Sequence, residues 1–465
     1  MDEHVAARLA AENAALRTEN QALRERVGTL QAQVQQLQDQ VEATTARVAE
    51  LEQGGQRRRK FGKPASTRRE ARPPRRVRVP EQNAGRAREE PTAFERHQYE
   101  QCPDCGYRLG GGSVWWQRQV VDLPPPAPLV VTEHTFVRRW CPVCRRWCVP
   151  PLPGGLSLGQ GRLGLGIASL VATLRTTLRL PIAQIQLYLE AMHGLHLSTG
   201  GIVDLLRRVA QVSAPAVADL RAQVQASPIV HGDETGWREG GQHGYLWLLT
   251  TPGPAPVCYV ERDRSRAHTV LDRLLGDQFR GVLASDFYGA YNSYPGKHQR
   301  CWAHLLRDLH ALKEQHPDQP AVRAWARAVR RLYLCATGFL HATDPPTAAQ
   351  RERYYARLAA ISHRLGLRYA QAKGHPCKAL AKRLLRHEAE LFQFVLVPGL
   401  SPDNNLAERR IRPLAVARKI SGGTRSPEGS ATRMALYSLF ATWQARGLNP
   451  FTACLALLIS LLHTA

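Results

Sequence analysis

The first 53 residues carry a heptad repeat of hydrophobic side chains. Leucine fills six of the seven d positions from Leu9 to Leu51, and valine fills the last four a positions. Valine at a with leucine at d favours a parallel two-stranded coiled coil, and Asn13 and Asn20 at a would fix its register. The repeat predicts a dimerisation helix over 1–53. The alternative is a single amphipathic helix that folds back on the rest of the chain.

Strand patterns appear later, and two of them end on acids. The apolar run within 227–238 reaches Asp233 and Glu234 before a glycine, and that within 281–289 closes on Asp286. Alternation along a strand places Asp233 on one face and Glu234 on the other, so only one of these neighbours can line a given site. We choose Asp233, and we expect it to share a site with Asp286.

The residues around these strands favour an α/β domain with an inserted part. Strand patterns over 244–250 and 257–260 and a helical pattern over 267–275 lie between the two acidic strands. A further 121 residues separate Asp286 from the next candidate acid, far more than one loop can hold in a compact domain. Their Ala, Leu and Arg content at helical spacing predicts a helical insertion over 305–397.

The next candidate acid, Glu408, lies on a predicted helix. Ser401 before a proline marks the start of this helix, and Pro413 is expected to limit its other end. Asn404 and Asn405 precede Glu408 by four and three residues, so their amides share its helix face.

Carboxylates on two strands and a helix are the ligands that hard divalent cations prefer. Asp233, Asp286 and Glu408 are therefore the candidate catalytic and metal-binding residues, for two Mg²⁺ or Mn²⁺ ions in two-metal phosphoryl chemistry. Nearby, Cys301 and His304 stand three residues apart. They are either a helix cap with a packed histidine or site residues that position a phosphate, since two ligands do not make a zinc site.

Half of the ten cysteines fall between Cys102 and Cys148. Two Cys-Pro-x-Cys knuckles with strand patterns over 114–123 and 130–140 between them predict a zinc ribbon with one structural Zn²⁺. Cys148 is the alternative fourth ligand, although it also suits a small buried hydrophobe. The remaining cysteines are scattered singly, as in a reducing compartment. The expected ligands are Cys102, Cys105, Cys141 and Cys144.

The formal net charge of +24 over 465 residues indicates a polyanionic partner, nucleic acid above all. Residues 57–78 hold eleven Lys or Arg and one acid, and such a run cannot bury a core. It is either a non-specific DNA arm or a solubilising linker. A helix, turn and capped helix over 180–208 resemble a helix-turn-helix, which is either a DNA reader or plain packing.

Several motifs together resemble the DDE transposases of the IS-sixty-six insertion-sequence family, from about residue 98 to the end of the chain. They are His231-Gly-Asp-Glu-Thr-Gly-Trp237, Ala284-Ser-Asp-Phe-Tyr-Gly-Ala-Tyr291, Cys301-Trp-Ala-His304, Asp403-Asn-Asn-Leu-Ala-Glu-Arg409, Arg418-Lys-Ile-Ser-Gly-Gly423 and Ser426-Pro-Glu-Gly-Ser430.

The resemblance implies an RNase H-like catalytic domain, with the first acid on its first strand and the second at the end of its fourth. It implies that Asp233 and Asp286 bridge two Mg²⁺ ions and that Glu408 holds the second. The activity implied is cleavage of the ends of the protein's own insertion element and joining of the freed 3′ hydroxyls to target DNA. Basic residues between Glu408 and Arg433 would suit DNA phosphates.

The expected fold is thus multidomain, and the protein is expected to act as at least a homodimer, with accessory proteins of the same element as further possible partners. Its parts are a coiled coil (1–53), a basic linker or DNA arm (54–97), a zinc ribbon (98–152), a helical part (153–226), a catalytic core in two pieces (227–304 and 398–465) and the helical insertion (305–397).

Two rival functions remain open. One is an RNase H-like nuclease without strand transfer, and the other is a zipper-bearing zinc-ribbon DNA-binding regulator without catalysis. The N-terminus has no signal-peptide pattern, and the apolar run over 453–462 is too short to span a bilayer. A cytoplasmic bacterial protein without a membrane segment, associated with the nucleoid when bound to DNA, is therefore expected.

Overall fold

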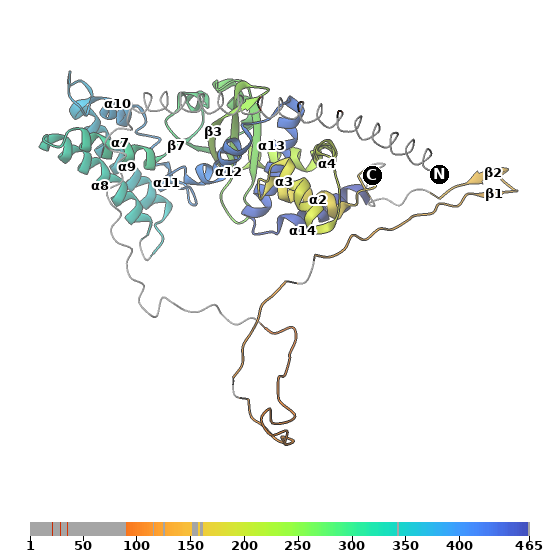
Figure 1. The fold of residues 1–465 in the computed structure, drawn as a ribbon. Helices are drawn as coiled ribbons and strands as arrows, with labels where there is room; N and C mark the ends of the chain where they lie inside the picture. The colour runs from red at the N-terminus through yellow and green to blue at the C-terminus, as the bar shows by residue number, and fades with distance from the viewer. Residues whose placement is uncertain are drawn as a thin grey trace, which may run out of the picture. The chain divides into compact units, whose positions relative to one another are not determined.

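A computed structural model describes residues 90–463 apart from 115, 124–125, 151–156, 159–160 and 342–343, together with Gln21, Gly28 and Gln35. The chain divides into two units, Met1–Ala87 and Arg88–Ala465, and the helices and strands named here belong to the second (Figure 1). The coiled coil predicted over 1–53 lies outside the described residues except at those three positions. The basic arm predicted over 57–78 lies outside them entirely.

The segment from Glu90 to Pro150 contains one short hairpin, in which β1 (Arg139–Cys141) pairs antiparallel with β2 (Arg146–Cys148). The strands predicted over 114–123 and 130–140 are wrong for the described residues, which have no regular structure there before β1. The apolar side chains of these stretches stay exposed, Val130 to 91%. Alternation alone does not make a strand without a partner strand and a surface to cover.

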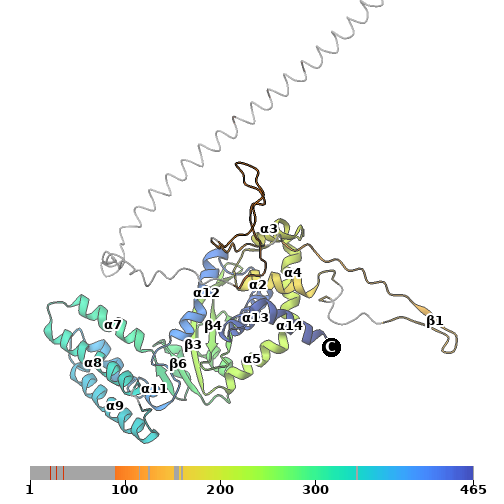
Figure 2. The same cartoon turned by 90° about the horizontal axis from the view of Figure 1, so that it is seen from below.

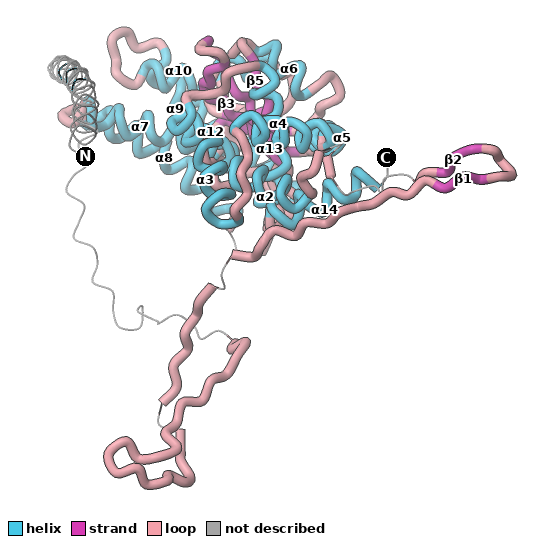
Figure 3. Tube along the Cα trace, turned by 45° about the vertical axis from the view of Figure 1, so that its right-hand side comes forward, coloured by secondary structure: helices cyan, strands magenta, loops and turns pink. Residues whose placement is uncertain are grey.

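In the described residues from Ser157 to Ala226, four helices precede the main sheet, and Figure 3 labels them among its cyan helices. The predicted helix, turn and capped helix over 180–208 is confirmed as α3 and α4. Gly194, in the left-handed region at φ 63°, ends α3, and Ser198 begins α4 by accepting a hydrogen bond from the Gly201 N–H at 3.0 Å. The helices are α2 (Leu165–Thr176), α3 (Ile182–His193), α4 (Thr199–Val212) and α5 (Ala214–Ala226).

The main sheet has five strands in the order β5-β4-β3-β6-β7, in which β3, β4 and β5 are antiparallel and β3, β6 and β7 parallel. β3 does not stop at its acids as predicted but continues to Glu239. Gly240 and Gly241, both at positive φ, turn the chain there into β4. The elements are β3 (Ile229–Glu239), β4 (Gln242–Thr250), β5 (Cys258–Asp263), α6 (His268–Leu275), β6 (Val282–Ser285), the short 3₁₀-helix η3 (Gly289–Ser293) and β7 (His298–Arg300).

Apolar side chains cover both faces of this sheet, as β4 shows. Trp247 and Leu249 join the cluster that contains residues of α2, α4 and α5, whereas Leu246 and Leu248 pack with Ile411 of α12. Figure 2 shows α12 beside β3 and β4. The period-two pattern of the strand thus separates a helical layer from the layer that carries α12.

The helical insertion predicted over 305–397 is helical in the structure, and these helices lie next to β7 (Figure 1). Their core, with Trp302 and Leu305, continues onto the sheet through Ile229 and Ala284. The helices therefore share a core with one sheet face. They are α7 (Trp302–Gln315), α8 (Pro320–Leu340), α9 (Ala348–Ala370), α10 (Lys378–Arg386) and α11 (Gln393–Leu396).

The chain ends in α12 (Asn405–Ser421), α13 (Pro427–Ala445) and α14 (Pro450–His463). Two predictions about α12 are wrong: it begins after Asn404 rather than at Ser401, and it runs through Pro413. Proline removes one backbone hydrogen bond of the helix. The carbonyl left without its helical donor is that of Arg409, and the Tyr437 hydroxyl donates to the next carbonyl, that of Arg410.

Helix α13 covers the outer edge of the sheet. Ser438 and Thr442, one helical turn apart, accept hydrogen bonds from the N–H groups of Val260 and Cys258 in β5 at 2.9 Å each. An open strand edge is thereby closed by side chains. Among the described residues no single helix is long and apolar enough to cross a membrane, and α13 and α14 meet that test only as a pair bent by 119°.

Candidate active site

Strands β3 and β6 place two aspartates at the same level of the sheet. The strands are parallel with His231 opposite Ala284, and the same register two residues further sets Asp233 opposite Asp286. Because side chains alternate along a strand, both acids project on the face that carries His231 and Ala284. Both are half-buried. Asp233 and Asp286, which are far apart in the sequence, therefore lie on adjacent strands, as a shared site requires.

Helix α12 is tied to β3 by the residue that caps it. Asn404 accepts a hydrogen bond from His231 Nδ1 at 3.1 Å, and its Nδ2 donates to the Gly232 carbonyl at 2.7 Å. His231 and Asn404 are each only 1% exposed, and burial lowers the pKa of His231, so the ring is a neutral donor. Glu408, one turn beyond this cap, is thereby delivered to the face that bears Asp233.

Burial and neighbouring negative charges change the pKa of Asp233. Burial first, and then the negative charges of Glu234, Asp286 and Glu408, raise the pKa of Asp233 to about 7. A hydrogen bond from the Glu234 N–H at 2.9 Å acts in the opposite direction. Like charges held together disfavour ionisation, and a divalent cation between them would relieve that cost.

Glu408 has a histidine neighbour that the sequence only partly indicates. His304 Nδ1 lies 3.6 Å from Glu408 Oε1, and both atoms are buried without a hydrogen-bond partner within the described part of the chain. With Cys301 they form a group whose ligand atoms lie within 4.8 Å of one another. Such unpaired buried atoms call for a proton, a water or a cation.

Cys301 is the weakest ligand of that group. Its sulfur accepts a hydrogen bond from the Asn404 N–H at 3.2 Å, and its side chain is buried. Burial raises the pKa of the thiol, which opposes the thiolate form that binds metals. We infer that Cys301 supports the start of α12, and that the carboxylates and His304 face the site.

A buried arginine supports Asp286. Arg300 in β7 donates to the Asp286 carbonyl at 3.0 Å and to Ser285 Oγ at 3.1 Å, and it pairs with Glu390. Burial opposes ionisation of Glu390, but hydrogen bonds and charge from His387 and Arg300 lower its pKa to about 2. No sequence pattern indicated this support, because Glu390 lies ninety residues after Arg300, in the helical part.

Asp286 itself is held by its own turn, since its Oδ1 accepts a hydrogen bond from the Tyr288 N–H at 2.8 Å. Glu234, as predicted from strand alternation, projects to the opposite face. There it accepts hydrogen bonds from Tyr291 and Arg266. Its charge is compensated by that pairing, whereas no cation of the described chain pairs with Asp233 or Asp286.

The predicted helix partners of Glu408 have other positions. Asn404 caps α12 and Asn405 is its first residue, and Asp403 precedes the cap. The Asp403 carboxylate accepts the Asn405 N–H at 3.0 Å. In the predicted basic stretch, Arg418 donates to Thr235 and to the Gly236 carbonyl, so this arginine holds α12 against β3.

The four predicted zinc ligands form two separate pairs. Cys102 and Cys105 lie in a tight turn, and Cys141 and Cys144 lie at the β1–β2 turn. Hydrogen bonds within each knuckle, first from the backbone of Cys105 and of Cys144 respectively, lower the pKa of Cys102 and Cys141. Cys148 ends β2 and is exposed. Among the described residues these thiols do not gather into one group, so four-ligand binding stays a prediction.

The chemistry of the donors fits a hard divalent cation. Asp233, Asp286 and Glu408 offer carboxylate oxygens, and His304 adds one nitrogen. Oxygen-rich sets of this kind suit Mg²⁺ or Mn²⁺ better than soft metals. The unpaired Glu408 Oε1 and the raised pKa of Asp233 are the observations that support a cation there.

Relatives of the chain share parts of it. It is 30% identical to the uncharacterized protein y4jO of Sinorhizobium fredii over 177 residues, which is 38% of this chain and 51% of that protein. It is 26% identical to y4jD of the same organism over 357 residues, 70% of this chain and 68% of that protein. A third protein, y4qI, is 26% identical over 42% of this chain and 38% of its own length. The chain thus spans about half of the first of these relatives.

A family model described as "Transposase IS66 family" matches residues 160–432. The match covers more than half of the chain and includes β3, β6 and the start of α12, which hold the three acids. It also contains the helices that precede the sheet and those inserted between β7 and α12. The chain therefore belongs to the IS66 transposase family.

Proposed function

We propose that this protein is a DNA transposase that cleaves the ends of its insertion element and joins them to target DNA in a metal-dependent reaction. The observation that supports this best is the convergence of Asp233, Asp286 and Glu408 from β3, β6 and α12 in a chain of a transposase family. Three clustered carboxylates are what two-metal phosphoryl transfer requires.

The sheet order supports an RNase H-like catalytic domain. Such a domain carries its first acid on the first strand and its second after the fourth. Asp233 on β3 and Asp286 after β6, the first and fourth strands of the five-stranded sheet, match these positions. Glu408 comes from a helix packed on the same sheet.

In this proposal Asp233 and Asp286 would together hold two Mg²⁺ or Mn²⁺ ions, with Glu408 on the second. When bound, these ions would activate the attacking oxygen and stabilise the leaving oxygen. Asp233 must lose its proton to take part, so metal binding and deprotonation are coupled. Asn404 sets the position of Glu408, and Arg300 that of Asp286, while His304 lies against Glu408 to orient it.

The rest of the proposal concerns partners. The substrate would be DNA. The protein would be located in the bacterial cytoplasm, where such DNA lies. Residues 1–53 would make at least a dimer, and residues 57–78 would bind phosphates without sequence preference. The two cysteine knuckles would hold one structural Zn²⁺. Proteins encoded by the same element are possible accessory partners.

The test is an assay with a DNA fragment that carries the element's own ends, in Mg²⁺. The proposal expects cleaved ends and, in addition, products joined to a second DNA. Cleavage without joined products would show that the protein is a nuclease rather than a transposase. DNA binding with no cleavage by wild-type protein, at any divalent metal, would favour the DNA-binding regulator instead.

A further inference from the structure

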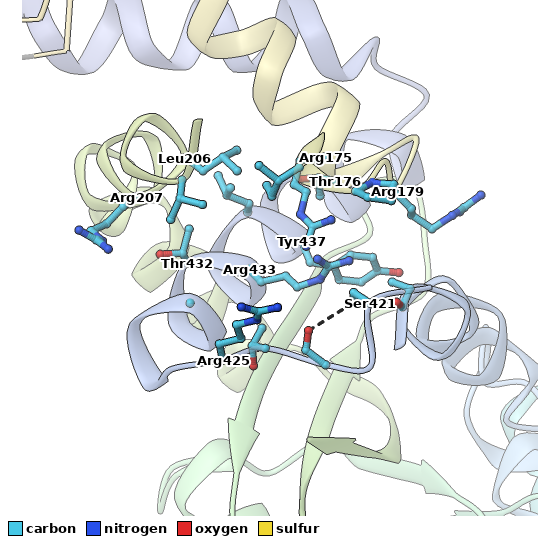
Figure 4. Close-up of a pocket in the computed structure, with 18 of the residues that line it drawn as sticks. Arg175, Thr176, Arg179, Leu206, Arg207, Ser421, Arg425, Thr432, Arg433 and Tyr437 are labelled. Carbon is cyan, nitrogen blue, oxygen red and sulfur yellow. Dashed lines mark hydrogen bonds between the residues drawn. The ribbon is translucent and has the colours of Figure 1, made fainter. Parts of the chain in front are cut away.

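A second site lies at the other end of α12. It is a cavity of about 810 Å³ lined by parts of α2, α3, α4, α12 and α13 and by the loop before α13 (Figure 4). Leu206, Leu414 and Leu436 contribute apolar lining, and Tyr437 an aromatic ring. A cavity of this size fits a small organic ligand rather than an ion alone.

Arginines dominate the charge of this cavity. Arg175, Arg179, Arg207, Arg425 and Arg433 line it, against a single acid, Asp204. Asp204 is already paired, with Arg207 at 3.8 Å and with Arg208 at 2.8 Å. The other four lining arginines have no carboxylate partner within the described part of the chain. Figure 4 shows Arg175 and Arg433 beside Tyr437, whereas Arg179 extends away from them.

Arg433 is the most deeply placed of these side chains. Its Nη1 is buried without a hydrogen-bond partner among the described residues, and its guanidinium lies 5.6 Å from the Trp237 ring. Burial, and then the charge of Arg175, lower the pKa of Arg433 to about 9. It remains a cation at neutral pH. A buried cation beside a second cation is costly, and an anion would offset that cost.

The backbone of the lining adds to the attraction for anions. Thr199 and Gly200 open α4, and Ser426 and Gly429 belong to the start of α13, so two helix N-termini border the cavity. Arg179 holds the left-handed conformation at φ 63°, unusual for a residue with a side chain. Such a conformation is retained where surrounding contacts enforce it.

We propose that this cavity binds a nucleotide, with the phosphate on Arg433 and Arg175 and the base against the apolar wall. The bound nucleotide would be an unpaired nucleotide of the DNA substrate, and in this respect the inference rests on the proposed function. Ala417 in the lining is the ninth residue after Glu408 along α12, roughly 14 Å away at 1.5 Å per residue. That is about four base steps of a duplex at 3.4 Å each, and an extruded base costs least where pairing is already lost.

The first experiment measures binding of thymidine 5′-monophosphate to the full chain by calorimetry, without divalent metal. Thymidine and inorganic phosphate serve as the two partial ligands. We expect the nucleotide to bind at least tenfold tighter than either. Equal binding of phosphate and nucleotide would overturn a nucleotide pocket, and so would no binding of the nucleotide.

Two variants test the charge and the free volume of the cavity separately. Arg433→Gln removes a cation from the lining, and Gly200→Leu adds a side chain there, at a position where a Cβ meets only Ser198 Oγ, at 3.9 Å. Both should weaken nucleotide binding at least tenfold. The matched controls are Gly166→Leu, at the same second position of α2 with nothing within 4 Å, and Arg327→Gln on the exposed face of α8. Nucleotide binding that survives Gly200→Leu would overturn the assignment to this cavity.

A separate experiment with duplex DNA tests whether the nucleotide comes from the DNA substrate. A duplex with one unpaired 2-aminopurine should change its fluorescence on binding wild-type protein and much less on binding Gly200→Leu. A response only to free nucleotide would overturn the DNA source. Asp286→Asn separates the two proposals: cavity binding should persist in it. If wild-type protein cleaves DNA but does not bind the nucleotide, only the proposed nucleotide site is overturned. If it binds the nucleotide but does not cleave DNA, only the proposed transposase activity is overturned.

Discussion

Charged side chains of opposite sign gather near the two ends of α12, and most of them have no oppositely charged partner among the described residues. Near its start, Asp233, Asp286 and Glu408 have no lysine or arginine partner among the described residues, and burial with the charges of Glu234, Asp286 and Glu408 raises the pKa of Asp233. Near its end, Arg433 and Arg175 lie together without a carboxylate. Elsewhere the chain pairs its buried charges, as Arg300 does with Glu390.

This difference indicates which groups are kept for ligands. A buried charge without a partner costs stability, and a fold tolerates it where a ligand of opposite sign repays the cost. Cations would do so at the acids, and a phosphate at the arginines. One helix then fixes the spacing between a cation site and an anion site, as a substrate with regularly spaced phosphates requires.

The largest expected effect follows from neutralising the acidic end. Asp286→Asn keeps the shape of the side chain but removes a charge that the cations need. DNA cleavage in Mg²⁺ should fall by at least ~10³, which is about 4 kcal/mol of transition-state stabilisation. Single-turnover cleavage of an end-bearing DNA fragment measures it, and Glu408→Gln should behave alike.

Asp318→Asn is the control, because this exposed acid lies in the turn between α7 and α8. It should cleave at the wild-type rate. Glu234→Gln should also retain most cleavage, although it weakens the contacts with Tyr291 and Arg266. Wild-type cleavage by Asp286→Asn would remove the catalytic assignment.

The next effect sharpens the contrast between a paired and an unpaired buried arginine. Arg300→Met should lower the free energy of unfolding by about 3 kcal/mol, because Glu390 then keeps only His387 as a partner and the acceptors on Ser285 and Asp286 lose their buried donor. Urea denaturation followed by tryptophan fluorescence measures it. Arg327→Met, on the exposed face of α8, should change stability by less than about 0.5 kcal/mol. A loss under about 1 kcal/mol for Arg300→Met would show that the pair supports little.

The third effect is a gain of stability from removing an acid. The pKa of Asp233 is raised from 3.8 to about 7 on folding, so the folded protein binds more protons in that window. Stability of the metal-free protein should therefore fall as pH rises from about 4 to 7. Asp233→Asn should remove this fall and stabilise the protein at pH 8 by on the order of 2 kcal/mol, after allowance for solvent screening.

Thermal melts in EDTA at pH 5 and pH 8 measure it. The gain at pH 8 should exceed that at pH 5, where the wild-type carboxyl is largely protonated. Added Mg²⁺ should stabilise the wild type and leave Asp233→Asn almost unchanged. A variant that is less stable than the wild type at pH 8 would contradict the proposed repulsion.

Sequence patterns predicted the acids but not what positions them. Apolar runs ending on Asp233 and Asp286 are local signals, and so are the helices around Ser198 and in the insertion. The start of α12 was placed wrongly, because Ser401 and Pro402 resemble a helix start while Asn404 is fixed by His231 across 173 residues. Long-range hydrogen bonds leave no local trace.

The other misses have the same physical cause. Pro413 suggested a helix end, but α12 packs on β3 and β4 and continues through it. The strands predicted beside the cysteine knuckles lack a partner surface. The arginine-lined cavity was not anticipated at all, since Arg175 and Arg433 come from helices more than 250 residues apart in the sequence.

The smallest expected effect tests the basic end of α12 by stability alone. Arg433→Met removes a buried cation that has no carboxylate partner, and methionine retains much of its length. The loss of the Trp237 contact costs about 0.5 kcal/mol or more, but relief of desolvation and of repulsion from Arg175 should outweigh it. We therefore expect a net gain of about 1 kcal/mol in phosphate-free buffer, opposite in sign to Arg300→Met. Thymidine 5′-monophosphate should stabilise the wild type and not the variant. A variant destabilised by more than about 1 kcal/mol would mean that Arg433 already has a partner within the protein. The arginines at the end of α12 would then be paired, unlike the acids at its start.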